Sequence, residues 1–109
     1  MICRHKQLAI GKWFKLSLIE QMANIGSEIE RTIIWKKKDK NISQRAFERA
    51  LELLNLTITD IKNKSRLKEI ARLREILIDY FQFENQFSSS DQLWRNYFNA
   101  FNFAACRNR

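Results

Sequence analysis

Residues 17–40 read SLIEQMANIGSEIERTIIWKKKDK, and this stretch decides the fold class. Ser17 and Glu20 have the spacing of a capping box, in which two side chains reciprocally satisfy backbone N–H groups at a helix start. An apolar stripe follows at three- and four-residue spacing, as in an amphipathic helix. The stripe consists of Leu18, Met22, Ile25, Ile29 and Ile33. We therefore predict a helix to about Lys37, with lysines complementing the negative end of its dipole.

Three further segments show the same periodicity and are predicted to be helices. The second runs from Asn41 or Ser43 to about Asp60, and the third from Asn63 or Ser65 to about Glu84. The fourth follows the SSSD of residues 88–91, where Ser88 with Asp91 or Ser89 with Gln92 could cap the helix. The connections between the helices are short, and short connections place successive helices antiparallel. We predict an all-α, antiparallel up-down-up-down four-helix bundle over residues 16–109, with residues 1–15 as a basic N-terminal tail or short extra helix.

The composition supports one all-α domain. A chain of 109 residues is long enough for one hydrophobic core and too short for two. It has no proline and only two glycines, so it lacks the turn residues of a β-sandwich or an α/β fold. Hydrophobic residues make up 45% of the chain and aromatic residues 12%, which excludes a disordered protein.

Gly26 lies within the first apolar stripe, where glycine costs a helix about 1 kcal/mol relative to alanine. One interpretation is the close approach of a neighbouring helix, with aromatic side chains of the fourth helix filling the space. The alternative is a tolerated surface glycine. We favour packing, because Ile25 and Ile29 flank Gly26 on the expected buried side.

The net charge of +8 is distributed unevenly. Residues 1–15 carry +4, residues 36–40 carry +3, residues 60–68 carry +3, and the C-terminal arginines add +2. In an antiparallel bundle all of these except residues 36–40 would lie at one end. A concentrated positive field attracts polyanions, so we predict a nucleic-acid-binding site at this end. Its predicted residues are Lys12, Lys15, Lys62, Lys64, Arg66, Lys68 and Arg107. Trp13, Phe14 and Phe103 are candidates for stacking on bases. Dipole compensation and solubility are the alternative explanation of these cations.

The last third of the chain holds more aromatic residues than one helix face can bury. The expected exposed remainder, which we predict to form a partner or oligomer interface, is Phe83, Phe87, Trp94 and Phe103. Exposed aromatic patches commonly mark such interfaces, so we expect a homo-oligomer. The alternative is that the N-terminal tail covers these side chains.

No motif indicates chemistry. The two cysteines, Cys3 and Cys106, show no CxxC spacing, and the single histidine is His5, so we expect reduced thiols and no metal site. The chain has no glycine-rich phosphate loop and no GxSxG motif. We therefore predict no catalytic residues, no cofactor and no enzymatic activity, and keep a small hydrolase only as a third hypothesis. No apolar run approaches the roughly 18 residues of a membrane span, so we expect a cytoplasmic protein without a membrane partner.

In size, charge and expected architecture, residues 17–106 resemble the small basic four-helix-bundle proteins of bacteria, such as the accessory protein of diversity-generating retroelements and the ribosomal intervening-sequence proteins. No signature motif of either is matched, so no functional residue is carried over. The resemblance implies an oligomeric bundle that assists a nucleic-acid enzyme or binds structured RNA. The sequence thus favours a non-enzymatic accessory protein that binds RNA or single-stranded DNA through a basic pole. The alternative is a protein-interaction or self-assembling scaffold module that docks through its aromatic fourth helix.

Overall fold

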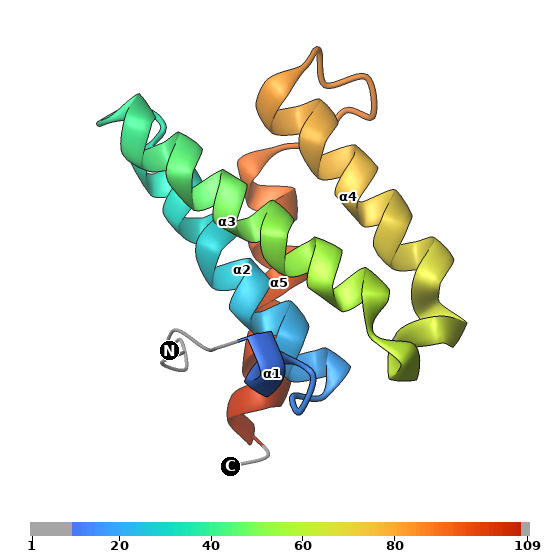
Figure 1. Ribbon diagram of the computed structural model, residues 1–109. Coiled ribbons are helices and arrows are strands. Elements are labelled where there is room, and N and C mark those ends of the chain that lie inside the picture. Colours follow the sequence, from blue (N-terminus) through green and yellow to red (C-terminus); the bar gives the residue numbers. More distant parts are fainter. Residues whose placement is uncertain (1–9, 108–109) are drawn as a thin grey trace.

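A computed structural model describes residues 10–107, and this part of the chain is 82% helical without a strand. Its elements are α1 (Ile10–Trp13), α2 (Leu18–Trp35), α3 (Lys40–Thr59), the 3-10 helix η1 (Ile61–Arg66), α4 (Leu67–Gln82) and α5 (Asp91–Arg107) (Figure 1). The four long helices confirm the all-α prediction. The short helix α1 falls in the segment expected to be a tail or an extra helix, of which residues 1–9 lie outside the described part.

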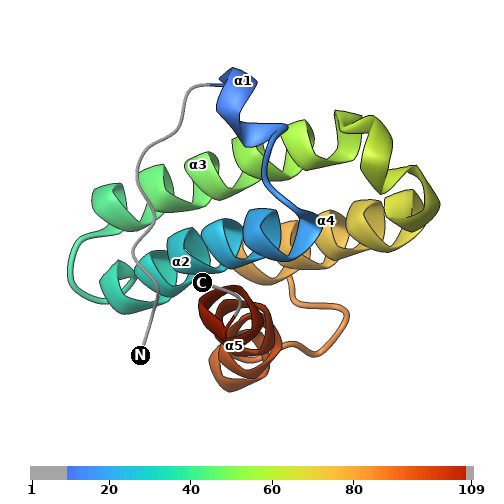
Figure 2. The same cartoon turned by 90° about the horizontal axis from the view of Figure 1, so that it is seen from below.

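Helix α2 is the centre of the arrangement, because it packs extensively against both α3 and α5, while α4 packs mainly against α3. Figure 2 shows α2, α3 and α4 lengthwise and α5 end-on, so α5 crosses the other three helices at a large angle. The structure therefore supports an all-helical domain with one divergent helix. The regular up-down-up-down bundle is a finer description that this arrangement does not establish.

The start of α2 is as predicted. The Ser17 backbone N–H donates to Glu20 Oε1 at 3.0 Å, and Ser17 Oγ accepts from the Glu20 backbone N–H at 3.1 Å. Both hydrogen bonds of the capping box are therefore present. The helix ends at Trp35, two residues before the predicted end.

The other helix starts differ from the prediction. Helix α3 is capped by Asp39, whose Oδ1 accepts from the backbone N–H groups of Asn41 and Ile42, and not by Asn41 or Ser43. At the start of α5 the cap is Ser90, whose Oγ accepts from the Leu93 backbone N–H at 3.1 Å. Several oxygen-bearing residues compete at each of these sites, and all of them favour a helix N-terminus.

The connection between α3 and α4 is more ordered than a loop. The Asp60 side chain accepts from the Lys62 backbone N–H at 3.2 Å and starts η1. Because η1 occupies residues 61–66, α4 begins at Leu67, later than the predicted Asn63 or Ser65, and it ends at Gln82 instead of Glu84. The basic residues of this connection are thus held on a helix.

The core consists of apolar residues that recur at three- and four-residue spacing on the long helices, as predicted for the first of them. Its buried members on the four long helices include Met22, Ile25, Ile29, Ile33, Phe47, Ala50, Leu54, Ile70, Leu73, Leu77, Trp94 and Phe98. On helix α5, the side chains of Leu93 and Tyr97 are 47% and 40% exposed. The face of α5 that packs on α2 bears Trp94, Phe98 and Ala105, which rotates Leu93 and Tyr97 outward.

The crossing of α2 and α5 depends on Gly26. An ideal Cβ placed on Gly26 would lie 2.7 Å from Phe98 Cβ and 3.0 Å from two atoms of its ring. This contact confirms that Gly26 allows an aromatic side chain of the last helix to approach the backbone of α2.

Ionic contacts secure the part of α5 that precedes this crossing. The Arg95 guanidinium donates to both carboxylate oxygens of Glu30 on α2, at 3.0 and 3.1 Å. At the start of α5, Asp91 Oδ1 accepts at 2.6 Å from both Lys36 Nζ and the Tyr80 hydroxyl. Burial raises the pKa of Asp91, but these hydrogen bonds outweigh burial and hold the pKa below its usual value.

Cys106 does not carry a free thiol, so the expectation of two reduced cysteines is wrong at this residue. Cys3 lies outside the described residues.

Gly26→Ala should destabilise the protein, although the same change stabilises an ordinary helix. The new methyl group would overlap Phe98, and overpacking of this kind costs about 1–3 kcal/mol, which exceeds the roughly 1 kcal/mol gained in helix propensity. Thermal unfolding followed by circular dichroism measures the effect.

Gly11→Ala is the matched control, because a Cβ at Gly11 would meet nothing within 4 Å. We expect its melting temperature to equal or slightly exceed that of the wild type. A Gly26→Ala variant as stable as the Gly11→Ala variant would contradict the close crossing of α2 and α5.

Candidate nucleic-acid interface

The predicted cationic residues lie on elements that meet at one end of the molecule. Helix α1, the start of α2, η1 with the start of α4, and the end of α5 all lie at the lower end of Figure 1, and Figure 2 views the molecule from this end. We call this end the basic pole. Its cationic residues are Lys12, Lys15, Lys62, Lys64, Arg66, Lys68 and Arg107.

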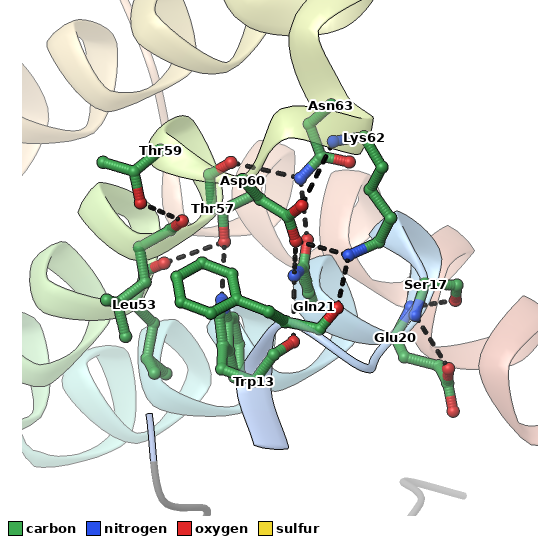
Figure 3. A network of polar contacts seen from close by, with 12 residues as sticks. Trp13, Ser17, Glu20, Gln21, Leu53, Thr57, Thr59, Asp60, Lys62 and Asn63 are labelled. Carbon is green, nitrogen blue, oxygen red and sulfur yellow. Dashed lines mark hydrogen bonds and ion pairs between the residues drawn. The ribbon is translucent and has the colours of Figure 1, made fainter. Parts of the chain in front are cut away.

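A buried network of polar side chains builds the basic pole, with Gln21 of α2 at its centre (Figure 3). The Gln21 side chain is fully buried, and its Nε2 donates to the Trp13 carbonyl at 3.1 Å and to Asp60 Oδ2 at 2.9 Å. Its Oε1 accepts from Asn63 Nδ2 at 2.9 Å. One side chain therefore joins α1, α2 and the turn between α3 and η1.

Trp13 is an anchor of α1 and is only 2% exposed. Its Nε1 donates to Thr57 Oγ1 at 3.2 Å, and Thr57 Oγ1 donates in turn to the Leu53 carbonyl at 2.8 Å. The expectation that Trp13 stacks on bases is therefore wrong, because the ring is enclosed in the core. Phe14, the next residue, is 39% exposed.

Two of the predicted phosphate ligands are engaged within the protein. Lys62 Nζ forms an ion pair with Asp60 and donates to the Phe14 carbonyl at 3.0 Å (Figure 3). Arg66 donates through Nε and Nη2 to Glu69 Oε2, at 3.1 and 2.8 Å. Lys62 thus helps to hold α1 in place, and its charge is partly compensated by Asp60.

The remaining five cations are exposed and have no ion-pair partner among residues 10–107: Lys12, Lys15, Lys64, Lys68 and Arg107. The carboxylates on the same elements are Glu20, Asp60 and Glu69. Seven cations and three carboxylates leave the described part of the pole with a net charge of +4. The pole is therefore positive even after its internal ion pairs are counted.

Asp60 links the polar network to the cations. Burial raises the pKa of Asp60, but hydrogen bonds from Lys62 and Gln21 outweigh burial and hold this pKa below its usual value. The carboxylate therefore stays ionised in the folded protein at neutral pH, and it keeps Lys62 turned inward toward Phe14.

The predicted aromatic interface is divided between two ends of the molecule. Phe83 is 71% exposed and Phe87 is 41% exposed. Both belong to the segment that follows α4, at the end opposite the basic pole. The Arg72 guanidinium carbon lies 5.6 Å from the centroid of the Phe87 ring. Phe103 is 66% exposed near the end of α5. Trp94 is only 3% exposed, so the prediction that it lies on the surface is wrong: its ring packs in the core beside Phe98.

Sequence reasoning did not find the network of Gln21, Thr57 and Asn63. The sequence carried a signal for Gln21 on α2 and for Thr57 on α3. Gln21 lies three residues after Leu18 and four before Ile25, and Thr57 lies three after Leu54, so both occupy core-facing positions. Buried polar groups need hydrogen-bond partners, which makes a polar residue in an apolar stripe a candidate for such a network.

Other kinds of site are not supported in the described part of the chain. Residues 10–107 hold no cluster of three or more histidine, cysteine, aspartate or glutamate side chains that could bind a metal ion. Within the same residues no helix has both the length and the apolar character that crossing a membrane requires.

No protein-family model, curated protein or solved structure matches this chain. The function must therefore be argued from the geometry and charge of the molecule itself.

Acid should destabilise the protein partly through Asp60. A carboxylate whose pKa is lowered by folding contributes stability above its unfolded pKa, and this contribution is lost as the pH falls through the folded pKa. Melting temperatures are measured from neutral pH to about pH 2. They should therefore decrease once the pH is lower than about 4. In Asp60→Asn the melting temperature should be lower at neutral pH and should depend less on acid.

Glu52→Gln is the control, because Glu52 is exposed and has no hydrogen bond or ion pair with the other described residues. Its acid profile should match that of the wild type. If Asp60→Asn gave the wild-type profile as well, Asp60 would not be the ionised centre of the network.

Proposed function

We propose that this protein is a non-enzymatic nucleic-acid-binding accessory protein, which binds RNA or single-stranded DNA through the basic pole. The observation that carries the proposal is the group of five exposed cations without an ion-pair partner in the described part of the chain. Four of them lie on or next to α1 and η1, which the Gln21 network joins to α2, and the fifth, Arg107, lies on α5. Neutralisation of phosphates by such side chains releases counterions and supplies most sequence-independent affinity.

The arrangement suits a polyanion better than a small anion. The unpaired cations lie on three different elements, namely α1 with its following turn, η1 with the start of α4, and the last turn of α5. Such a spread matches the repeated phosphates of a strand, since each exposed lysine contacts one phosphate as a point charge. Lys64 and Lys68 are four residues apart at the junction of η1 and α4, and both are exposed.

In this proposal the molecule is a four-helix bundle of the up-down-up-down type, and the resemblance to basic bacterial bundle proteins supports an accessory role beside a nucleic-acid enzyme in the cytoplasm. Lys62 and Arg66 belong to the interface chiefly as residues that hold it in shape, because both are engaged by neighbouring carboxylates.

A protein-interaction or self-assembling scaffold is the second candidate, and the exposure of Phe83 and Phe103 favours it. Phe83 directly follows α4 and Phe103 is near the end of α5, and these two segments lie at opposite ends of the molecule in Figure 1. The two residues therefore offer separate contacts and not one continuous aromatic surface. A homo-oligomer built through both contacts would leave the basic pole partly accessible.

The double variant Lys64→Glu with Lys68→Glu should bind RNA at least about tenfold more weakly than the wild type, because it removes two phosphate contacts and adds repulsion. Fluorescence anisotropy with a labelled single-stranded RNA, repeated at several salt concentrations, measures both affinity and salt dependence. The slope of log affinity against log salt should become shallower by about 0.7 for each lost contact.

The double variant Lys37→Glu with Lys40→Glu is the matched control. It changes the net charge by the same amount, but at the connection between α2 and α3, away from the basic pole. It should retain near-wild-type affinity. An equal loss in both double variants would point to a general effect of net charge, and no RNA binding by the wild type at low salt would end the proposal.

The scaffold candidate predicts an oligomer whose mass does not depend on salt. Light scattering after size-exclusion chromatography measures the mass of wild type, Phe83→Ser and Phe103→Ser. Because both rings are largely exposed, either change should dissociate the oligomer without loss of folding. A monomeric wild type would contradict self-assembly.

A further inference from the structure

A groove opens at the basic pole between α2, α4 and α5. Its volume is about 70 Å³, and its apolar walls include Ile19 of α2, Ile70 of α4, and Tyr97 and Phe101 of α5. It exists because α5 packs on α2 while α4 packs on α3, so the facing sides of α4 and α5 are not closed against each other. Tyr97 and Ile19 remain 40% and 38% exposed at this groove.

Aromatic rings form the α5 wall of the groove. The centroids of Tyr97 and Phe101 lie 5.4 Å apart, and Tyr97 also packs edge-on against Phe98 at 5.0 Å. Because Phe98 is fixed on Gly26 of α2, the Tyr97 ring is supported from behind although its side chain is partly exposed. This is a rigid, half-exposed aromatic surface beside cationic side chains.

The rim of the groove carries both hydrogen-bond donors and acceptors. Arg66 and Glu69 line it, and their ion pair uses Nε and Nη2 of the guanidinium and only Oε2 of the carboxylate. Nη1 and Oε1 are not used in this pair. The pair also affects Tyr97, because burial and the charge of Glu69 raise the pKa of its hydroxyl group.

We infer that this groove binds an unpaired nucleobase, which stacks on Tyr97, contacts with its edge the Phe101 ring inclined at 60° to Tyr97, and presents its polar groups to Arg66 and Glu69. The inference rests on the proposed function, and it names single-stranded nucleic acid as the ligand class. Aromatic side chains stack on bases of any sequence, and an arginine plane does the same. A base edge carries donors and acceptors together, which matches the two unused groups of the ion pair.

The surrounding charge favours this occupant over others. Lys68 precedes Glu69 on α4, and Lys15 precedes α2 by three residues, so phosphates on either side of an inserted base would meet cations. A second copy of the chain would bring a net charge of +8 to a positive surface. The bases of a duplex are stacked and paired, so they cannot enter the groove.

The test compares Tyr97→Leu with Phe83→Leu, an exposed aromatic residue after α4 that does not line the groove. Fluorescence anisotropy is measured with labelled oligouridine and with an RNA duplex of equal phosphate number. Loss of one base stack weakens binding at least about fivefold, so Tyr97→Leu should bind oligouridine at least about fivefold more weakly. Its duplex affinity should be unchanged, and Phe83→Leu should behave as wild type with both probes.

A second measurement needs no variant. Oligouridine with 5-iodouridine is photo-crosslinked to the wild-type protein, and tandem mass spectrometry of the peptides locates the attachment. We expect attachment at Tyr97 or Phe101. This result decides the question even if Tyr97→Leu fails to fold, as judged by circular dichroism.

The remaining outcomes separate the two proposals. Equal oligouridine affinity of a folded Tyr97→Leu and the wild type, or cross-links confined to residues outside the groove, would overturn the base site and leave the basic pole standing. No binding of either probe at low salt would overturn both. If labelled polyglutamate bound the wild type but not Tyr97→Leu, while oligouridine binding were unaffected, the groove would belong to an acidic polypeptide and the inference would be wrong.

Discussion

The buried side-chain amide of Gln21 joins three segments that are distant in the sequence, because it donates to the Trp13 carbonyl and to Asp60 and accepts from Asn63. A buried amide without partners would cost several kcal/mol. Here both its donor group and its acceptor atom are used. The network therefore stabilises one arrangement of α1, α2 and η1 relative to alternative arrangements of these segments. The contacts of this single side chain hold α1 and η1, which carry most cations of the basic pole, against α2.

The network also explains how a cluster of like charges is tolerated. Asp60 lies at the inner edge of the pole, where it receives hydrogen bonds from Lys62 and Gln21. Part of the positive charge is thereby compensated from within, and the cations left unpaired in residues 10–107 project from elements that are already fixed. Preorganisation of this kind lowers the entropy that a ligand must remove on binding.

Helix periodicity predicted the four long helices and most of the core, because the buried residues recur at three- and four-residue spacing on each helix. The capping box of Ser17 and Glu20 could be predicted because it is a local pattern with one physical explanation. The packing role of Gly26 could be favoured over a surface position because Ile25 and Ile29 flank it in the apolar stripe. The start of α3 could not be predicted as well, since Asp39, Asn41 and Ser43 are all suitable caps.

Long-range contacts set the limits of sequence reasoning at the candidate site. The cations were expected at one end because short connections return the chain to the same pole. Whether each cation stays exposed depends on its neighbours: Lys62 turns toward Asp60 and Phe14, and Arg66 toward Glu69. Likewise, the rotation of α5 that buries Trp94 and exposes Tyr97 is fixed by Phe98 on Gly26, a contact between residues 72 positions apart.

The packing of α5 against the central helix also has a consequence for the order of folding. Helices α2 and α3 are neighbours in the sequence and can pair while the chain is still emerging from the ribosome. The side of α2 that includes Gly26 has to wait for the last described helix to be synthesised. During that interval Ile25 and Ile29 lack their final neighbours on that side, and the nascent chain presents a temporary apolar surface of the kind that chaperones recognise.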